Sequence, residues 1–240
     1  MGSKTYQRIL LKISGESLQG SKGHGYDPDA VASVVERVKK ALETGVEIAL
    51  VTGAGNLWRG LAGSKGGKMD RVTADQMGML ATAMNALCLK DAFRAAGVDC
   101  SVHSAVDMMP FAPRYDRDRA LKELEAHKLV IFAAGTGSPY FSPDTCAALR
   151  ALEIKAQAVL KATKVNGVYT ADPKKDPSAK RFETITFDEV LARKLAVMDS
   201  AAFALCSEND LPIIVFDFDE PDALPKILAG DSSVGTTVTK

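Results

Sequence analysis

Two apolar runs in this chain each end in a glycine turn that carries a basic residue. The first run ends in Lys12-Ile13-Ser14-Gly15, and the second ends in Gly53-Ala54-Gly55-Asn56, with Arg59 shortly after it. A glycine turn lets backbone N–H groups approach an anion closely, and the basic side chains supply positive charge. The chemistry expected of these residues is phosphate binding. Two facing phosphate sites favour transfer between nucleotides.

Neither turn matches a standard nucleotide-binding motif. Trp58 stands where a dinucleotide fingerprint has its third glycine, and the segment closest to a Walker loop, Gly66-Gly67-Lys68, lacks the leading glycine. By itself the Gly53-Ala54-Gly55 turn is equally compatible with a plain strand-to-helix connection. Lys12 favours binding, because an ammonium in an apolar strand is costly to bury without an anion. The alternative is that Lys12 reaches solvent from the end of its strand.

Two later segments carry groups that could bind a nucleotide. The segment 135–144 follows the most hydrophobic run and combines hydroxyls, two aromatic rings and a carboxylate. Its hydroxyls and backbone groups could read a base edge, and Asp144 could hold a lysine or a magnesium ion. The plainer alternative is that Asp144 only caps a helix. The second segment begins with Lys161-Ala162-Thr163-Lys164 and continues to Tyr169 and Asp172, so it offers an aromatic face for adenine and lysines for phosphates.

The composition argues against several other classes of function. Thirty basic and thirty acidic side chains cancel, so no global charge attracts the protein to nucleic acid or to a membrane surface. The chain has neither a secretion signal nor an apolar run of about 20 residues, and we expect a cytoplasmic protein. Four widely spaced cysteines are predicted to be buried structural thiols: Cys88, Cys100, Cys146 and Cys206. Three histidines lack metal-ligand spacing and are predicted to lie on the surface or in loops: His24, His103 and His127.

The elements that must position these groups alternate between strands and helices. Apolar spacing predicts helices over residues 28–44, 74–96, 118–126, 145–152, 187–193 and 200–207. Strands are predicted over 8–13, 46–52, 98–102, 129–134, 159–160, 168–169 and 213–216 and around Val238. This alternation predicts an α/β fold, a three-layer αβα sandwich with a largely parallel central sheet and ligands beyond the carboxyl ends of the strands. We expect one domain, residues 1–240, with approximate lobes 1–155 and 156–240.

Several segments together give the chain a resemblance to a known family. They are Lys12-Ile13-Ser14-Gly15-Glu16, Gly55-Asn56-Leu57, Arg59-Gly60, Asp75-Gln76-Met77-Gly78-Met79-Leu80-Ala81-Thr82, Gly135-Thr136-Gly137, Lys161-Ala162-Thr163-Lys164-Val165 and Val197-Met198-Asp199. Over essentially its whole length the chain resembles the amino acid kinase superfamily and, within it, the bacterial UMP kinase family. The resemblance implies the amino acid kinase (carbamate kinase-like) fold. It also implies transfer of the ATP γ-phosphoryl group to UMP, giving UDP and ADP in pyrimidine biosynthesis, with Mg²⁺ accompanying ATP.

The resemblance further assigns roles to individual residues. The implied catalytic residues are Lys12, Arg59, Asp144 and Lys161, and Asp199 is implied to be a structural or organising acid. The implied ATP-binding residues are Lys12, Ile13, Ser14, Gly15, Gly55, Arg59, Thr163, Tyr169 and Asp172. The implied UMP-binding residues are Ala54, Asp75, Thr136, Gly137, Ser138, Pro139, Tyr140, Phe141, Ser142 and Pro143. A segment linked in the family to activation by GTP matches Gly20, Ser21, Lys22, Gly23, His24 and Gly25. Members are typically homohexamers inhibited by UTP.

Three positions depart from the family's usual pattern. Ala54 replaces the middle glycine of a Gly-Gly-Gly-Asn turn. Because alanine at a positive φ costs about 1 kcal/mol or more, we predict that Ala54 does not have a positive φ. Ser138 replaces an asparagine, and Pro143 replaces a threonine. Because proline has neither an N–H nor a hydroxyl, any donor contact at position 143 is lost or taken over by Ser142 or by the backbone.

Two other functions remain open from the sequence. A related enzyme could phosphorylate a carboxylate substrate, but such a site would require groups that grip an amino acid, whereas Asp75 suits ribose hydroxyls. A nucleotide-binding sensor on the same fold could lose the groups that support transfer. This chain retains Lys12, Asp144 and Lys161, which argues against a sensor.

Overall fold

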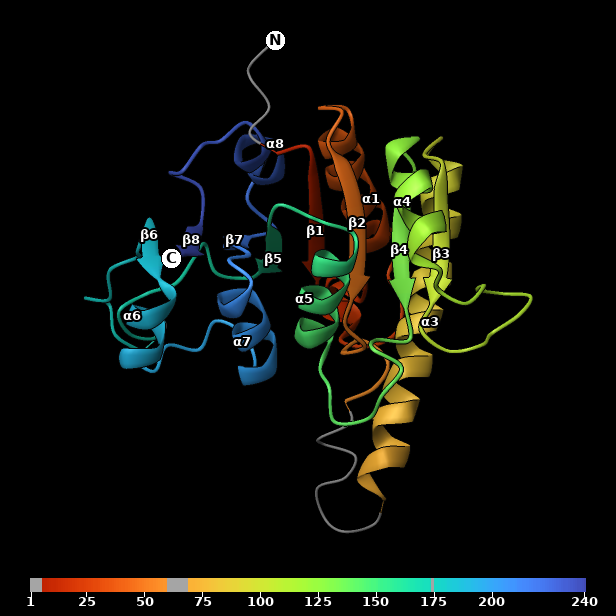
Figure 1. Ribbon diagram of the computed structural model, residues 1–240, viewed down its shortest axis with the longest axis horizontal. Helices are drawn as coiled ribbons and strands as arrows, with labels where there is room; N and C mark the ends of the chain where they lie inside the picture. The colour runs from red at the N-terminus through yellow and green to blue at the C-terminus, as the bar shows by residue number, and fades with distance from the viewer. Residues whose placement is uncertain (1–5, 60–68, 174) are drawn as a thin grey trace.

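One sheet of eight strands runs through the middle of the molecule (Figure 1). The computed structural model describes residues 6–59, 69–173 and 175–240, so Gly60 and Gly66-Gly67-Lys68 lie outside the described residues. The strand order is β3-β4-β2-β1-β5-β7-β8-β6. The strands are β1 (Arg8–Ile13), β2 (Glu47–Thr52), β3 (Cys100–Ser104), β4 (Leu129–Ala133), β5 (Val159–Thr163), β6 (Thr184–Thr186), β7 (Ile213–Asp217) and β8 (Thr236–Thr239). Neighbouring strands are parallel except β7 and β8, which confirms a largely parallel sheet.

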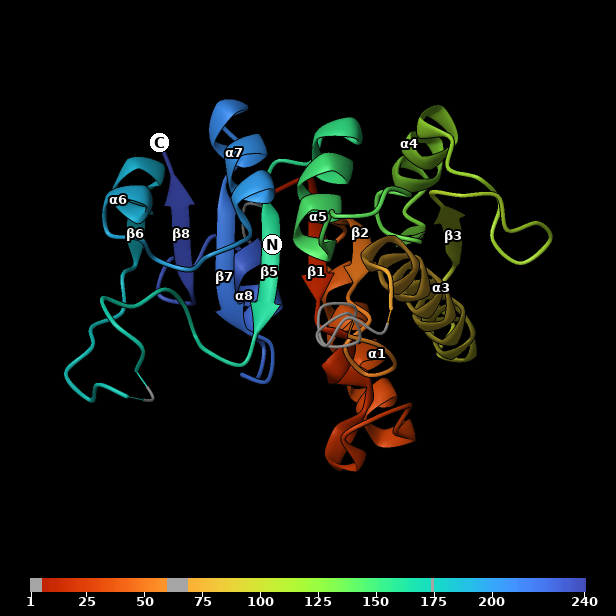
Figure 2. The same ribbon diagram turned by 90° about the horizontal axis from the view of Figure 1, so that it is seen from below.

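Helices cover both faces of this sheet (Figures 1 and 2). One face packs against α1 (Pro28–Leu42), α3 (Arg71–Ala95) and α8 (Ala223–Leu228). The other packs against α4 (Arg117–Glu125), α5 (Pro143–Glu153), α6 (Phe187–Ala192) and α7 (Ser200–Glu208). Two short 3₁₀ helices, η1 (Gly15–Leu18) and η2 (Gly20–Lys22), follow β1. The predicted three-layer αβα sandwich is confirmed.

Local sequence explains why the first elements form. On β1, Leu10 enters one core, and its neighbours Ile9 and Leu11 enter the other, because successive side chains of a strand point to opposite faces. Helix α1 begins where the Asp27 carboxylate accepts hydrogen bonds from two backbone N–H groups of the first turn, with Pro28 as the first helical residue. Its valines recur at helical spacing and are buried against the sheet. These elements place the first glycine turn at the carboxyl end of β1.

The chain differs from the predicted pattern in several places. The strand expected at residues 168–169 is only a single bridge between Tyr169 and Arg181. Strand β3 begins at Cys100, two residues later than expected. Strand β6 and helix α8 were not predicted, because β6 has only three residues and α8 contains Pro225 and follows an N-cap residue with a φ of 58°.

The prediction that His103 lies on the surface or in a loop is wrong. It is fully buried on β3, where its Nε2 lies 2.5 Å from Glu123 Oε2 and Arg119 Nη2 lies 3.1 Å from its Nδ1. Tyr115 and Phe132 pack edge-on against its ring. Burial lowers the pKa of His103, although Glu123 opposes that shift. The other histidines, His24 and His127, are exposed as predicted.

The cysteine prediction holds for three thiols, because Cys100, Cys146 and Cys206 are buried, while Cys88 is only partly buried. All four are free thiols. Within the described residues, no helix combines the length and the apolar character needed to cross a membrane.

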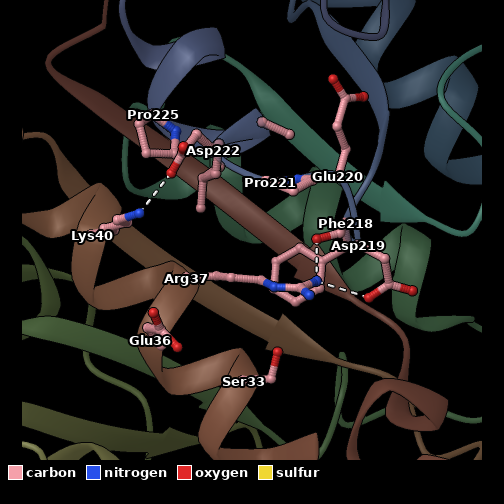
Figure 3. Close-up of a pocket in the computed structure, with 12 residues that line it drawn as sticks. Ser33, Glu36, Arg37, Lys40, Phe218, Asp219, Glu220, Pro221, Asp222 and Pro225 are labelled. Atoms are coloured by element: carbon pink, nitrogen blue, oxygen red, sulfur yellow. Dashed lines mark hydrogen bonds and ion pairs between the residues drawn. The ribbon is translucent and has the colours of Figure 1, made fainter.

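Side chains from α1 connect this helix to the segment between β7 and α8 (Figure 3). Arg37 Nη1 donates to Phe218 O and lies 2.8 Å from Asp219 Oδ1, and the guanidinium lies over the Phe218 ring. Lys40 Nζ lies 2.7 Å from Asp222 Oδ1. These contacts border a cavity of about 250 Å³ and connect α1 to the segment between β7 and α8.

We predict that Arg37→Ala lowers the free energy of unfolding by about 1 kcal/mol, since it removes a partly buried hydrogen bond and a cation–π contact. Lys40→Ala is the matched control, because its ion pair is exposed and screened by solvent. Urea unfolding of both variants tests this. Equal losses in the two variants would contradict the prediction.

Candidate active site

A carboxylate at the start of α5 lies between two lysines from neighbouring strands. Lys12 on β1 and Lys161 on β5 are register partners, so their side chains leave the same face of the sheet. Lys161 Nζ donates to Asp144 Oδ2 at 2.7 Å and to Val197 O at 2.6 Å. Lys12 Nζ lies 3.0 Å from Asp144 Oδ1, as an ion pair without hydrogen-bond geometry. With 14% of its side chain exposed, Lys12 pairs with an anion and does not extend into solvent.

The two ammonium groups determine the charge state of Asp144. Burial acts to raise the pKa of Asp144, but Lys12 and Lys161 outweigh burial and hold it below its ordinary value of 3.8. The carboxylate therefore stays ionised at neutral pH and keeps the two lysines close together. A surface that carries two ammonium groups side by side is suited to polyanionic phosphate.

This low pKa predicts the pH dependence of stability. Asp144→Asn is expected to lower the free energy of unfolding by about 3 kcal/mol at neutral pH, because it leaves two poorly solvated lysines without their anion. A carboxyl group whose pKa is lower in the folded than in the unfolded state stabilises the fold fully above its unfolded-state pKa. This contribution is lost as the pH falls through the folded-state pKa. The difference between wild type and variant should therefore be largest above about pH 4 and shrink below it.

Urea unfolding of both proteins across this pH range checks the expectation. Asp99→Asn is the control, because Asp99 forms an exposed pair with Lys128. A gap between wild type and Asp144→Asn that stays constant down to the most acidic sample would contradict the assignment of the low pKa to Asp144.

The beginnings of α5 and α7 are joined by Asp199. Its Oδ1 accepts hydrogen bonds from two backbone N–H groups in the first turn of α7, each at 3.0 Å. Thr145 Oγ1 donates to Asp199 at 3.0 Å, and Ser142 Oγ donates to it as well. Ser142 also caps α5 by accepting from Asp144 N at 2.9 Å. The capping role that the sequence left open for Asp144 thus belongs to Ser142, and the Asp144 side chain is available to the lysines.

The two glycine turns are in direct contact. Gly53 N donates to Ile13 O at 3.0 Å. A Cβ placed on Gly15 would lie 2.5 Å from Gly53 O and 2.8 Å from Gly55 N, which are distances that no side chain tolerates. Gly15 is therefore required for the close approach of the turns. The prediction for Ala54 is confirmed, because it is not among the residues with a positive φ.

A buried pair of amides holds the second turn in place. Asn85 on α3 donates through Nδ2 to Gly53 O and to Asn56 Oδ1, both at 2.8 Å, and Asn56 Nδ2 donates to Asn85 Oδ1 at 3.0 Å. Asn56 also bonds to the segment 20–25, because its Nδ2 donates to Gly25 O and its carbonyl accepts from Gly25 N. The segment predicted to respond to GTP is thereby attached to a turn predicted to bind phosphate.

Arg59 and Glu16 form an ion pair beside the two turns. The Arg59 side chain is 64% exposed, so it can change partners at little cost. Glu16 belongs to η1 and lies against Gly55, since a Cβ on Gly55 would approach Glu16 Cγ to 3.2 Å.

A cavity of about 320 Å³ opens between the second glycine turn, α3 and the segment 135–143. Seven of the residues implied to bind UMP border it: Ala54, Asp75, Thr136, Tyr140, Phe141, Ser142 and Pro143. The other three, Gly137, Ser138 and Pro139, belong to the same segment but do not border the cavity. Pro143 is the first residue of α5, and the hydroxyl of the adjacent Ser142 is engaged within the protein by Asp199 and by the first turn of α5.

Asp75 connects α3 to the segment 135–143 across this cavity. Its Oδ2 accepts from Arg71 Nε and from Tyr140 N, both at 2.8 Å. Tyr140 has a φ of 70°, and the Arg71 guanidinium lies 5.2 Å from the centre of its ring. Arg71 thus adds a positive charge to the cavity.

The other residues implied to bind ATP lie at the end of β5 and after it. Strand β5 is on the opposite side of β1 from the cavity. Thr163 ends β5 two positions after Lys161, and its Oγ1 bonds to the backbone of Val165. The long segment between β5 and β6 runs out to one side of the sheet (Figure 2). It contains Tyr169 and Asp172, and the Tyr169 hydroxyl donates to Asn166 Oδ1. The two lysines therefore lie between the cavity and this segment.

Five residues that border or support the site were assigned no role from the sequence: Glu16, Trp58, Arg71, Thr82 and Asn85. The sequence did contain a signal for two of them. Asn85 is an amide within an apolar helical run, and Arg71 lies one helical turn before Asp75. The other partners depend on contacts between distant segments.

Comparisons with known proteins agree with this geometry. The profile of the Amino acid kinase family matches residues 7–217. The structure is similar to UMP kinase from Bacillus anthracis, with a TM-score of 0.94 and 33% identity over 98% of this chain and 96% of that chain. It is similar to UMP kinase from Ureaplasma parvum, with a TM-score of 0.91 and 38% identity over 98% and 99%. Uridylate kinase from Archaeoglobus fulgidus shares the fold, with a TM-score of 0.72 and 23% identity over 96% and 99%. The chain therefore belongs to the amino acid kinase family.

Proposed function

We propose that the protein is a UMP kinase, which transfers the γ-phosphoryl group of ATP to UMP and forms UDP and ADP. The observation that carries this proposal is the pair of lysines held by Asp144 next to the 320 Å³ cavity. The two UMP kinases with 33% and 38% identity support UMP as the acceptor. Asp75 suits the ribose hydroxyls of a nucleotide.

The chain's own groups are suited to this reaction. The acceptor is an ionised phosphate and needs no strong general base, so the main obstacle is the repulsion between two anions. Lys12 and Lys161, together with backbone N–H groups at the Gly15 and Gly55 turns, would bind the phosphates and stabilise charge in the transition state. Asp144 would keep both lysines in place, and Arg59 would contact phosphate from the exposed side.

Mg²⁺ would accompany ATP and offset phosphate charge. The two carboxylates nearest the lysines are already engaged: Asp144 is paired with Lys12 and Lys161, and Asp199 accepts hydrogen bonds from α5 and α7. This arrangement fits a Mg²⁺ ion that is held mainly by the phosphates of ATP. Within the described ranges, no cluster of three or more histidine, cysteine or acidic residues could hold a metal.

A coupled ADP-release assay with ATP and Mg²⁺ tests the proposal. The acceptors to compare are UMP, CMP, acetylglutamate and aspartate. Turnover with UMP, and not with the amino acids, is the expected result. Turnover with an amino acid alone would replace the proposal with a carboxylate kinase. ATP binding without turnover of any acceptor would favour a nucleotide sensor.

We also propose regulation by nucleotides, in a cytoplasmic enzyme of pyrimidine biosynthesis. The hydrogen bonds between Gly25 and Asn56 support activation by GTP through residues 20–25, because they connect this segment to the phosphate-binding turn. Inhibition by UTP is proposed from the family resemblance. A GTP titration at fixed UMP that leaves the rate unchanged would remove the first proposal, and a UTP titration without inhibition would remove the second.

Self-association as a homohexamer is a further part of the proposal. Helix α3 exposes Leu80 and Met84, with 57% and 54% of each residue accessible, although their spacing is that of a packed helical face. These large apolar side chains would be covered in an assembly. A monomeric mass in light scattering would contradict this part of the proposal.

A further inference from the structure

The turn that follows β4 begins in an unusual backbone conformation. Ala134 and Gly135 have φ values of 61° and 58°. Glycine adopts this left-handed region freely, but alanine does not, because its Cβ approaches the following carbonyl oxygen. Such strain persists only where the surrounding structure holds it, and it is concentrated at functional sites.

A threonine on α3 holds the strained residue. Thr82 Oγ1 accepts a hydrogen bond from Ala134 N at 3.1 Å and donates its own proton to Met79 O at 2.7 Å. Both partners are buried, since Thr82 is 4% exposed and Ala134 is fully buried. The hydroxyl is thus engaged as donor and as acceptor within the protein.

The strained turn and Thr82 border the same cavity. Thr82, Gly135 and Thr136 all line the 320 Å³ space assigned to UMP. The turn is closed by a hydrogen bond from Gly137 N to Ala134 O at 3.0 Å. Thr136 Oγ1 then accepts from Ser138 N and donates to Ser138 O, both at 3.2 Å. The position of Ala134 therefore determines which backbone groups and which hydroxyl the turn presents to the cavity.

We propose that Thr82 is a positioning residue for the acceptor nucleotide. By holding the N–H of Ala134, its hydroxyl keeps the turn in the conformation that binds UMP and distinguishes it from CMP. This inference rests on the proposed function, but the hold of Thr82 on the turn is a property of the protein without substrate.

The kinetic test compares Thr82→Val, which keeps the shape and removes the hydroxyl, with Thr82→Ser, which keeps the hydroxyl. Thr82→Val is expected to raise the KM for UMP about tenfold, equivalent to about 1.4 kcal/mol, and to reduce the preference for UMP over CMP. The KM for ATP and the kcat per folded molecule should change less than about twofold, because no group that acts on the transferring phosphoryl is removed. Thr82→Ser should restore the wild-type KM.

Amide hydrogen exchange tests the hold on the turn without substrate. The Ala134 amide should be protected in the full wild-type chain and in Thr82→Ser, and it should exchange much faster in Thr82→Val. If Thr82→Val does not fold, Thr82→Ala replaces it, because the smaller side chain fits the same space.

Three results would overturn the inference. One is an unchanged KM for UMP together with only a lower melting temperature, which would indicate a structural role. Another is an equal rise in the KM for ATP and for UMP. The third is equal exchange of the Ala134 amide in wild type and Thr82→Val. If wild type fails to phosphorylate UMP, the proposed function falls, while the exchange experiment still decides whether Thr82 holds the turn.

Discussion

Lys12→Met is expected to lower the kcat for UMP phosphorylation by about 10²–10³-fold, the range typical of removing one preorganised charge-stabilising group. Methionine has a similar length and packs in the same space, but it carries no charge. Lys12 lies 3.0 Å from Asp144, and its register partner on β5 is Lys161. Among the described residues, its removal would leave Lys161 as the one ammonium beside Asp144 that offsets the repulsion between donor and acceptor phosphates. The KM for UMP should change less than kcat, since the donor and acceptor phosphates come closest to each other in the transition state.

The coupled ADP-release assay measures this effect, with each rate divided by the folded fraction from circular dichroism. Lys128→Met is the matched control, because Lys128 also forms a 3.0 Å ion pair, but with Asp99 at the far edge of the sheet. A loss in kcat smaller than about tenfold for Lys12→Met would contradict a role in charge stabilisation. An equal loss in both variants would point to a general effect of removing a lysine.

Gly15→Ala is expected to reduce kcat/KM by about 10²-fold or more, because displacement of a binding group by about 1 Å is enough for a loss of that size. The added methyl would lie 2.5 Å from Gly53 O and 2.6 Å from Asn56 Oδ1. Neither neighbour can move away easily, because Gly53 is backbone and Asn56 is held by Asn85. The two glycine turns must therefore separate. Overpacking of this kind also lowers the free energy of unfolding, by about 1–3 kcal/mol.

Gly97→Ala is the control for Gly15→Ala, because it replaces a glycine without creating a steric clash. Gly97 has a φ of 79° and no atom within 4 Å of an added Cβ, so only backbone strain is introduced, of about 1–2 kcal/mol. Both variants should lose stability, but only Gly15→Ala should lose activity per folded molecule. Steady-state kinetics and urea unfolding of the two variants give the answer. Wild-type activity in Gly15→Ala would mean that the close contact of the turns is not needed for catalysis.

Local sequence patterns were enough to predict the layers of the fold and the two glycine turns. The helical spacing of valines after Asp27 and the apolar run before Gly53 each depend on residues close together in the chain, so periodicity and glycine position reveal them. The resemblance then assigned roles to Lys12, Asp144 and Lys161. The conformation of Ala54 followed from the steric demand of a single Cβ.

Local patterns failed where a side chain's surroundings come from distant segments. The sequence shows His103 as one polar residue in a short strand, but its burial depends on Glu123, Arg119 and the aromatic rings that pack around it. Leu80 and Met84 have the spacing of a core face, yet they are exposed, because α3 buries a different face that includes Ala86, Leu89 and Phe93.

The sequence by itself therefore determined most of the strands and helices and both glycine turns, because those preferences are set by near neighbours and by backbone sterics. Tertiary structure decided that Lys12 and Lys161 lie side by side, since only the pairing of β1 with β5 brings their positions into register. It also decided that Thr82 reaches the strained Ala134. Strand order and register arise from the burial of two apolar cores built from the whole chain, and no local pattern contains that information.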